Sequence, residues 1–326
     1  MIIPNAKEVE QARELLGRYL RPTRLVLAES LAQRSGARVF LKIESDLPTG
    51  SFKPRGALNA LLTTAAQRPV AGVVAASTGN HGAAVAYAAR IAKVGATIFL
   101  PENPNPVKRA RIVALGAKVI ERGDMGGSAT SEGAAEFARE QGHYFLDDAS
   151  DPLVPEGTAT IAAEIFDEIP KPDILFVPMG DTALIRGVAA ETKRRHPGVR
   201  IIGVQAEQAP AYVRSWQQGR VVIPAECDTI ADGLASLRPL EANVIAIREL
   251  VDEVRLVSEQ EMLDAIRVLL LEEHVVAEAS GAAATAAFLQ NPSAYADAKV
   301  LLLVTGANVS PEVIRRAVIQ EFRSAL

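Results

Sequence analysis

The sequence predicts an α/β fold in which parallel-rich sheets are flanked by helices. Short apolar runs rich in β-branched residues alternate along the chain with longer, alanine-rich segments of helical period. The apolar runs are continuous rather than alternating, which indicates strands that are buried on both faces, as in parallel sheets. An alternation of such strands with helices is typical of an α/β sandwich with right-handed crossovers.

The predicted strands share this composition and lie at 39–41, 73–76, 97–100, 118–120, 174–177, 201–204 and 300–304. The predicted helices lie between them, at roughly 56–68, 82–93, 106–115, 128–141, 158–169, 184–195, 259–273, 280–290 and 310–323. The region 206–257 has the least regular pattern, and we expect it to wrap the sheet.

We expect a small domain inserted into a larger one. Residues 73–141 contain strand–helix units of their own, and this run ends before the less regular stretch at 143–155. The sequence therefore predicts residues 72–141 as the small domain and residues 1–71 plus 142–326 as the large domain.

The composition favours a soluble cytoplasmic protein. The chain has 326 residues, of which 48% are hydrophobic, and a net charge of -4. No basic stretch is able to follow a phosphate backbone, so we expect no nucleic-acid partner. The charged N-terminus lacks the apolar core of a signal peptide, and no apolar run approaches the roughly 18 residues of a membrane span. The single cysteine, Cys227, excludes an internal disulfide and fits a reducing compartment.

Four predicted strand-to-helix junctions are rich in glycine and small polar residues. Ligands of open α/β sheets bind beyond the carboxyl ends of the strands, so parallel sheets would bring these junctions to one crevice. At one junction, Gly180 would let backbone amides converge on an anion at a helix N-terminus. The alternative there is an ordinary tight turn with Asp181 as the helix cap. The junctions are 47–53, 77–82, 179–184 and 305–308.

Lys53 follows an aromatic residue, Phe52, at the start of a predicted helix. Pro54 comes next and fixes the angle at which the chain enters the helix. Most lysines are solvated surface residues. A lysine held at a helix start in a partly apolar cleft is expected to have a lowered pKa, which favours imine chemistry.

Six segments, in order along the chain, resemble landmarks of a known family. They are 51–57 (SFKPRGA), 77–82 (STGNHG), 156–158 (EGT), 231–235 (ADGLA), 278–282 (EASGA) and 305–308 (TGAN). The set resembles the fold-type II enzymes that depend on pyridoxal 5'-phosphate (PLP), the threonine/serine dehydratase and serine racemase family. The resemblance implies a tryptophan synthase β-like fold whose large domain binds PLP. Relatives are commonly dimers, so it also implies a homodimer.

The resemblance implies a role for each matching residue. Lys53 would hold PLP as a Schiff base and then act as the base at the substrate Cα. Phe52 would lie near the pyridine ring, Asn80 would hydrogen-bond the ring hydroxyl, and Thr305 would hydrogen-bond the pyridine nitrogen. The substrate carboxylate would be received by Ser77, Thr78, Asn80 and His81. The cofactor phosphate would be held by Gly180, Asp181, Thr182, Ala183 and Leu184.

The family position of Thr305 favours elimination. A neutral hydroxyl cannot protonate the pyridine, so the ring is a weaker electron sink and a long-lived carbanion is less favoured. The resemblance implies an ammonia-lyase (dehydratase) that converts a small β-hydroxy amino acid, such as threonine or serine, into a 2-keto acid and ammonia. One alternative is a serine-type racemase in which Thr78 is the second catalytic residue, although a helix-capping role for Thr78 is the simpler interpretation. Another alternative is a non-catalytic PLP-binding regulator.

Residues 180–183 depart from the four glycines that the family usually carries there. Asp181 is awkward beside a phosphate dianion, because two unit charges ~4 Å apart interact by roughly 4 kcal/mol at an effective dielectric of ~20. We therefore expect its side chain to point away from the phosphate, as a helix cap or paired with Arg186.

Two further departures from the family concern charge. Relatives that bind a divalent cation do so with carboxylates where this chain has Gln205 and Ala211, so we predict no metal site, with Glu207 and Asp232 as the remaining carboxylates. Acidic residues replace amides or aromatic residues at Asp147, Asp148 and Glu156. These residues either belong to a solvated loop or select a substrate that bears a hydrogen-bond donor or a positive group.

Overall fold

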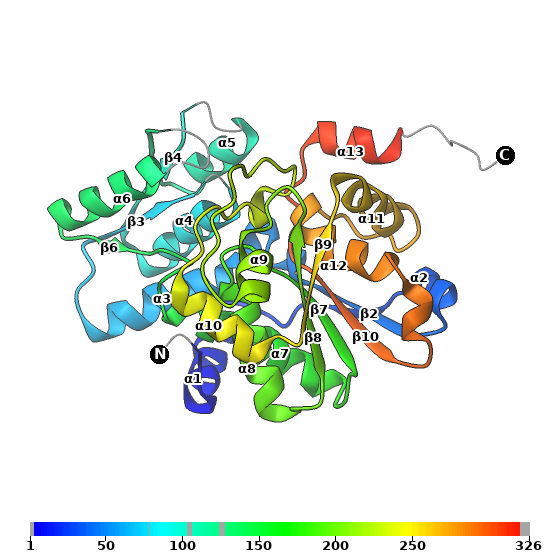
Figure 1. Ribbon diagram of the computed structural model, residues 1–326. Helices are drawn as coiled ribbons and strands as arrows, with labels where there is room; N and C mark the ends of the chain where they lie inside the picture. Colours follow the sequence, from blue (N-terminus) through cyan, green and yellow to red (C-terminus); the bar gives the residue numbers. More distant parts are fainter. Residues whose placement is uncertain (1–2, 78, 103–105, 124–127, 320–326) are drawn as a thin grey trace.

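The computed structural model describes residues 3–77, 79–102, 106–123 and 128–319 (Figure 1). Its strands are β1 (Leu25–Leu27), β2 (Arg38–Ile43), β3 (Gly72–Ala76), β4 (Gly95–Leu100), β5 (Lys118–Glu121), β6 (Tyr144–Phe145), β7 (Ile174–Pro178), β8 (Arg200–Ala206), β9 (Glu253–Val257) and β10 (Lys299–Val304). They form a six-stranded sheet, ordered β1-β2-β10-β7-β8-β9, and a four-stranded sheet, ordered β5-β4-β3-β6. Among these strands only β1 runs antiparallel to its neighbour, so the predicted α/β class with parallel-rich sheets is confirmed.

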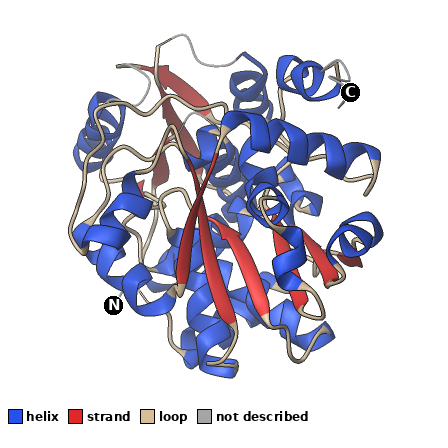
Figure 2. Ribbon diagram, turned by 45° about the vertical axis from the view of Figure 1, so that its right-hand side comes forward, coloured by secondary structure: helices blue, strands red, loops and turns tan. Residues whose placement is uncertain are grey.

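Helices surround both sheets (Figure 2). They are α1 (Ala6–Leu16), α2 (Glu29–Ser35), α3 (Lys53–Gln67), α4 (Asn80–Ala92), α5 (Pro106–Ala114), α6 (Ser128–Gln141), α7 (Leu153–Glu168), α8 (Ala183–Arg195), α9 (Ala211–Gln218), α10 (Glu241–Leu250), α11 (Glu259–Leu271), α12 (Ala279–Leu289) and α13 (Pro311–Val318). Short 3-10 turns occupy Glu44–Asp46, Pro48–Gly50, Asp232–Leu234 and Pro292–Tyr295. Within the described ranges, no helix combines the length and apolar character needed to cross a bilayer.

The central strand of the larger sheet, β10, is buried on both faces. Val300, Leu302 and Val304 pack into a core with α11 and α12. Leu301 and Leu303 point the other way and pack into a core with α7, α8 and α10. Successive side chains of a strand face opposite sides of the sheet, so a strand covered on both sides must be apolar throughout.

The smaller sheet is organised in the same way. Val73 and Ala75 of β3 pack against α3 and α4, whereas Val74 faces α6. The sheet continues past residue 141, because β6 pairs with β3 in parallel. The division of the chain into two domains itself stays a prediction.

The elements that the sequence pattern did not predict lie in the N-terminal part of the chain, at sheet edges or in the region 206–257. β1 and β9 are the edge strands of the larger sheet, and most of their residues are only partly buried. α9, α10 and β9 lie in the region that was expected to be irregular. Their apolar residues alternate with charged ones, which hides the continuous apolar signal of a central strand.

A buried ion network anchors the start of α3. Arg55 is 1% exposed and donates from Nε and Nη2 to both oxygens of Glu44, at 2.7 and 2.9 Å. Its Nη1 and Nη2 donate to both oxygens of Glu164, at 2.6 and 2.8 Å. Lys42, on β2, donates to Glu164 at 2.7 Å and to the Thr23 carbonyl at 2.8 Å. The network therefore joins β2, α3 and α7 through two cations and two carboxylates.

The charges of this network depend on one another. Desolvation lowers the pKa of Arg55, but the attraction of Glu44 and Glu164 outweighs it and the net shift is upward. The pKa of Glu164 is lowered, because Arg55 and Lys42 overcome the effect of its own burial. Removal of one partner would leave the others charged in a low-dielectric interior, which is strongly destabilising.

We expect Arg55→Ala to lower the free energy of unfolding by about 3–5 kcal/mol, because Glu44 and Glu164 would lose their shared cation. The measurement is urea unfolding followed by circular dichroism. The matched control is Arg24→Ala, which breaks the exposed ion pair with Asp46 and should cost less than about 1 kcal/mol. Equal losses in the two variants would contradict an anchoring role for Arg55.

Candidate active site

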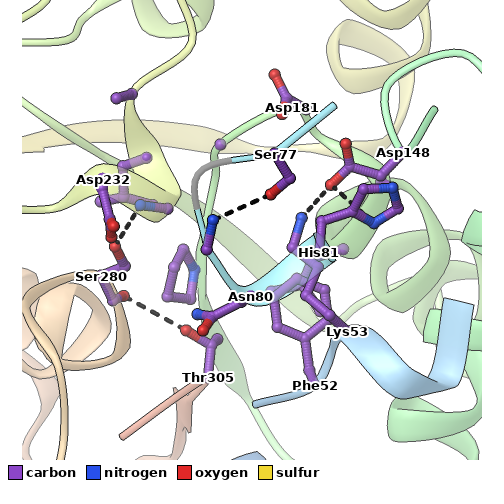
Figure 3. A pocket seen from close by; sticks show the side chains of 18 of the residues that line it. Phe52, Lys53, Ser77, Asn80, His81, Asp148, Asp181, Asp232, Ser280 and Thr305 are labelled. Carbon is purple, nitrogen blue, oxygen red and sulfur yellow. Dashed lines mark hydrogen bonds and ion pairs between the residues drawn. The ribbon is translucent and has the colours of Figure 1, made fainter. Parts of the chain in front are cut away.

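A cavity opens between the two sheets where several strands end (Figure 3). The carboxyl ends of β3, β7 and β10 reach it through Ala76, Pro178 and Thr305. It has a cavity volume of about 170 Å³. The structure brings together at this cavity the predicted residues Phe52, Lys53, Ser77, Asn80, His81, Gly180, Asp181, Thr182, Ala183, Leu184 and Thr305.

Backbone contacts of the two residues that precede Lys53 hold it at the cavity. The Phe52 amide donates to the Thr305 carbonyl at 3.0 Å, so the start of α3 is tied to the end of β10. Ser51 forms an isolated bridge with Gly306 in the same place. Before this bridge, Thr49 adopts a left-handed conformation with φ 74°. Such backbone strain is costly for a β-branched residue and is found preferentially at functional sites.

The nearest charged partner of Lys53 is Asp148, and the two side chains form an ion pair. His81 lies on the other side of Asp148, with its Nδ1 3.8 Å from the carboxylate. The His81 Nε2 lies 3.0 Å from the Leu146 carbonyl, a pure acceptor, and so carries a proton. Figure 3 shows the three side chains side by side in the wall of the cavity.

The pKa of Lys53 is raised rather than lowered. Desolvation alone would lower it, as expected from the sequence, but Coulomb attraction from Asp148 and then Asp181 outweighs that effect. The expected lowering of the Lys53 pKa was therefore wrong. The same ion pair lowers the pKa of Asp148, since His81 and Lys53 together overcome the cost of burying its charge.

The loop before α8 has the geometry of an anion site. Thr182 is the N-cap of this helix and has a left-handed φ of 70°, and no side chain caps the first turn. Uncapped amides at a helix N-terminus favour an anion. Gly180 is required here, because a Cβ at this position would lie 2.2 Å from the Gly233 carbonyl oxygen. The segment 231–235, noted above only as a sequence landmark, therefore closes the cavity against this loop.

Asp181 does not take either of the positions expected for it. Thr182 is the N-cap in its place, and the guanidinium of Arg186 donates instead to Thr182 Oγ1 at 3.2 Å and to the Ala149 carbonyl at 2.9 Å. Both the capping role and the pairing with Arg186 were wrong. Asp181 lines the cavity, and desolvation together with the nearby Asp148 raises its pKa to about 6.

Asn80 is held rigidly at the start of α4. Its Nδ2 donates to Glu278 at 2.6 Å, and its Oδ1 accepts from Asn308 at 2.6 Å. Thr305 is 4% exposed, and its hydroxyl lies 3.5 Å from the Ser280 carbonyl. These contacts place an amide and a hydroxyl in one wall of the cavity, and their roles toward a cofactor stay predictions. Ser77 accepts from the Gly79 amide at 3.2 Å.

The remaining candidate residues lie in different places. Thr78, predicted as a catalytic and substrate residue, is outside the described residues. Glu156 lies in the first turn of α7, accepts from Asn59 at 3.2 Å and does not line the cavity. Asp147 accepts from the Ser150 amide at 3.2 Å. Of the three acidic residues noted in the sequence, only Asp148 reaches the cavity wall.

The described residues contain no group of three or more potential protein ligands arranged for a metal ion. Gln205 Oε1 instead accepts from the Val213 amide at 3.0 Å. The absence of a divalent-cation site stays a prediction from the uncharged side chains at 205 and 211.

Comparisons with known proteins agree with this geometry. Residues 17–306 match the family model described as pyridoxal-phosphate dependent enzyme. The L-threonine ammonia-lyase of Thermotoga maritima is 35% identical over 312 residues, which are 96% of this chain and 77% of that protein. Maize serine racemase superposes with a TM-score of 0.90 at 26% identity, covering 97% of each chain. The threonine deaminase of T.th. has a TM-score of 0.87 at 32% identity, covering 94% of this chain and 99% of that one.

We expect Asp148→Asn to lower the pKa of Lys53, because the substitution removes the strongest attraction and leaves the desolvation. The measurement is a titration of labelled lysine side chains by nuclear magnetic resonance without any ligand, with the Lys53 signal assigned by its loss in Lys53→Met. Asp147→Asn is the matched control, since Asp147 raises the pKa of Lys53 less than Asp148 does. An unchanged Lys53 pKa in Asp148→Asn would show that the ion pair does not set it.

The pKa of Asp181 also predicts a pH dependence of stability. Its folded value, about 6, lies above the usual carboxyl value of about 4. The folded protein therefore keeps a proton that the unfolded chain has lost, and stability falls as the pH rises through this window. Asp181→Asn should gain thermal stability relative to the wild type between pH ~4 and pH ~7.

Asp46→Asn is the control of opposite sign for this pH series. A hydrogen bond from Arg24 lowers the pKa of Asp46, so its stabilising effect is present at neutral pH and is lost in acid. The stability of Asp46→Asn relative to the wild type should therefore be lowest at neutral pH. A difference between Asp181→Asn and the wild type that does not vary with pH would rule out the Asp181 titration.

Proposed function

The chain belongs to the family of pyridoxal-phosphate dependent enzymes, and from this premise we propose that it is a lyase that removes water and ammonia from a small β-hydroxy amino acid. The observation that carries the proposal is the position of Lys53, in a cavity built from the carboxyl ends of strands of both sheets. The similarity to threonine ammonia-lyase over 96% of the chain supports this reaction class.

The residues around the cavity fit the cofactor. Lys53 offers the amine for the covalent link, and the uncapped start of α8 offers amide donors for the phosphate. Asn80 and Thr305 offer an amide and a hydroxyl for the ring. The close approach of Gly180 to Gly233 leaves no space for a side chain at position 180. Asp181 has an unfavourable charge for a phosphate site, and its raised pKa reduces the conflict.

The cofactor, when bound, supplies an electron sink for the electron pair left when the substrate Cα loses its proton. The Lys53 amine takes that proton, and its contact with Asp148 holds it in place. The Cβ–O bond breaks, and the hydroxyl takes the proton now held by Lys53 and leaves as water. The amides of the 77–81 loop receive the substrate carboxylate. The enamine that departs takes up one water as it becomes a 2-keto acid and ammonia, so the reaction balances without an oxidant.

The racemase alternative uses the same residues. Its support is the superposition on maize serine racemase, and it needs a second proton donor on the other face of Cα, a role predicted for Thr78. A threonine at position 305 favours the lyase, because it stabilises a carbanion less than an acidic residue would.

We also propose that the enzyme is cytoplasmic and forms a homodimer. A single cysteine, Cys227, is consistent with a reducing compartment. Leu240 and Ile245 are large apolar residues that remain exposed at α10, and exposed apolar side chains are a feature of protein interfaces. Size-exclusion chromatography with light scattering measures the oligomeric state.

We expect the purified protein to carry a visible absorbance band of bound cofactor that is lost in Lys53→Ala and kept in Lys171→Ala, an exposed control. Borohydride reduction followed by peptide mass spectrometry should place the cofactor on Lys53. L-threonine and L-serine should yield 2-keto acid and ammonia. A product that is the other enantiomer, without keto acid, would identify the racemase, and a bound cofactor with neither product would favour the regulator.

A further inference from the structure

Acidic side chains dominate the cavity. Among the residues that the structure describes, the ionisable ones in its wall are four carboxylates and two bases: Asp148, Asp181, Asp232, Glu278, Lys53 and His81. The cavity is identified as the catalytic site by Lys53 and by the strand ends, independently of these carboxylates. Both the cofactor phosphate and the substrate carboxylate would add negative charge to this site. The excess of carboxylates therefore calls for a cation in the ligand.

Two of these carboxylates lie near the amine that must reach the substrate Cα. Asp148 is in direct contact with Lys53, and both Asp148 and Asp181 act on the Lys53 charge. In the view of Figure 3, Asp148 and Asp181 lie on one side of Lys53, while Phe52 and Thr305 lie on the other. The amine that must reach the substrate Cα therefore lies in the same cavity as both carboxylates and is influenced by both.

The hydrogen-bond partner of the Asp181 side chain is a neutral residue, Ser236. Asp181 does not cap α8, and across the described residues the ion pair of Lys53 is formed with Asp148 rather than with Asp181. Its charge is disfavoured by desolvation and by Asp148, and Lys53 and Ser236 oppose this only in part. A carboxylate kept in such surroundings within a cleft is a candidate for ligand recognition.

We propose that the preferred substrate is a β-hydroxy amino acid whose side chain carries a second ammonium group, and that Asp148 and Asp181 recognise this group. The proposal rests on the lyase function proposed above and narrows its substrate class. A second ammonium would supply the positive charge that the cavity lacks. An uncharged side chain, as in threonine, would leave Asp181 without a cation, and a side-chain carboxylate would be repelled by both residues.

The test measures binding rather than turnover. The ligands are 2-aminobutyrate, 2,4-diaminobutyrate and aspartate, which are similar in size, carry a neutral, positive or negative side chain, and have no β-hydroxyl to eliminate. Dissociation constants are measured by calorimetry on the holoenzyme. We expect 2,4-diaminobutyrate to bind at least about tenfold more tightly than 2-aminobutyrate, with aspartate the weakest.

The variants are compared by the ratio of two dissociation constants, that of 2-aminobutyrate divided by that of 2,4-diaminobutyrate. Both constants are measured on the same protein, so the ratio does not depend on how much cofactor that protein holds. Asp181→Asn and Asp148→Asn should each bring the ratio toward one, whereas Asp147→Asn, outside the cavity wall, should keep it. The same order should appear in kcat/KM for 2,4-diamino-3-hydroxybutyrate, threonine and 3-hydroxyaspartate.

Failure of this inference differs from failure of the lyase proposal. Equal affinities for 2-aminobutyrate and 2,4-diaminobutyrate in the wild type, with threonine still converted to a keto acid, would overturn the substrate class alone. Tight binding of 2,4-diaminobutyrate without any keto acid from the three hydroxylated substrates would support the recognition and overturn the lyase. Binding of none of the ligands would overturn both.

Discussion

The buried ions around Arg55 fix the position of the reactive lysine. Arg55 is two residues from Lys53 in the first turn of α3, and its guanidinium is held by carboxylates of Glu44 and Glu164. A buried network of this kind is seldom more stabilising than apolar packing, but its directional hydrogen bonds allow one arrangement of the helix start. With the bond from Phe52 to Thr305, it holds Lys53 from two sides, and the cavity is assembled around that fixed point.

The sequence predicts most of the interior of the fold and little of its periphery, for a physical reason. Central strands such as β7 and β10 must be apolar on both faces, so their signal is continuous and local. Edge strands are only partly buried: β9 mixes charged with apolar residues and so resembles a loop, and β1 is only three residues long. The shared location of the four glycine-rich junctions was also predictable, because parallel strands end at the same edge of a sheet.

The contacts inside the site could not be predicted from residues that are neighbours in the sequence. Asp148 is 95 residues from Lys53 in the sequence, and Glu278 is 198 residues from Asn80. The sequence marked Asp148 as an unusual acidic residue and 278–282 as a landmark, but no pattern paired them with their partners. The pKa of Lys53 was misjudged for this reason: burial can be inferred from neighbours in the sequence, whereas a counter-charge from a distant segment cannot. Asp181 was likewise assigned to a cap or to Arg186 because both lie close to it along the chain.

The contact between Asp148 and Lys53 links recognition to reactivity. A lysine that acts as a base must be neutral, yet in the ligand-free cavity the carboxylate favours its charged form. An ammonium group brought by the substrate would compete for the same carboxylate. As Asp148 turns toward the new cation, the strongest influence that raises the Lys53 pKa weakens while the desolvation remains, so the pKa falls. A substrate with an uncharged side chain would compete less for Asp148, so a larger share of Lys53 would stay protonated and turnover would be slower. One carboxylate would thus both select the substrate and release the base that acts on it.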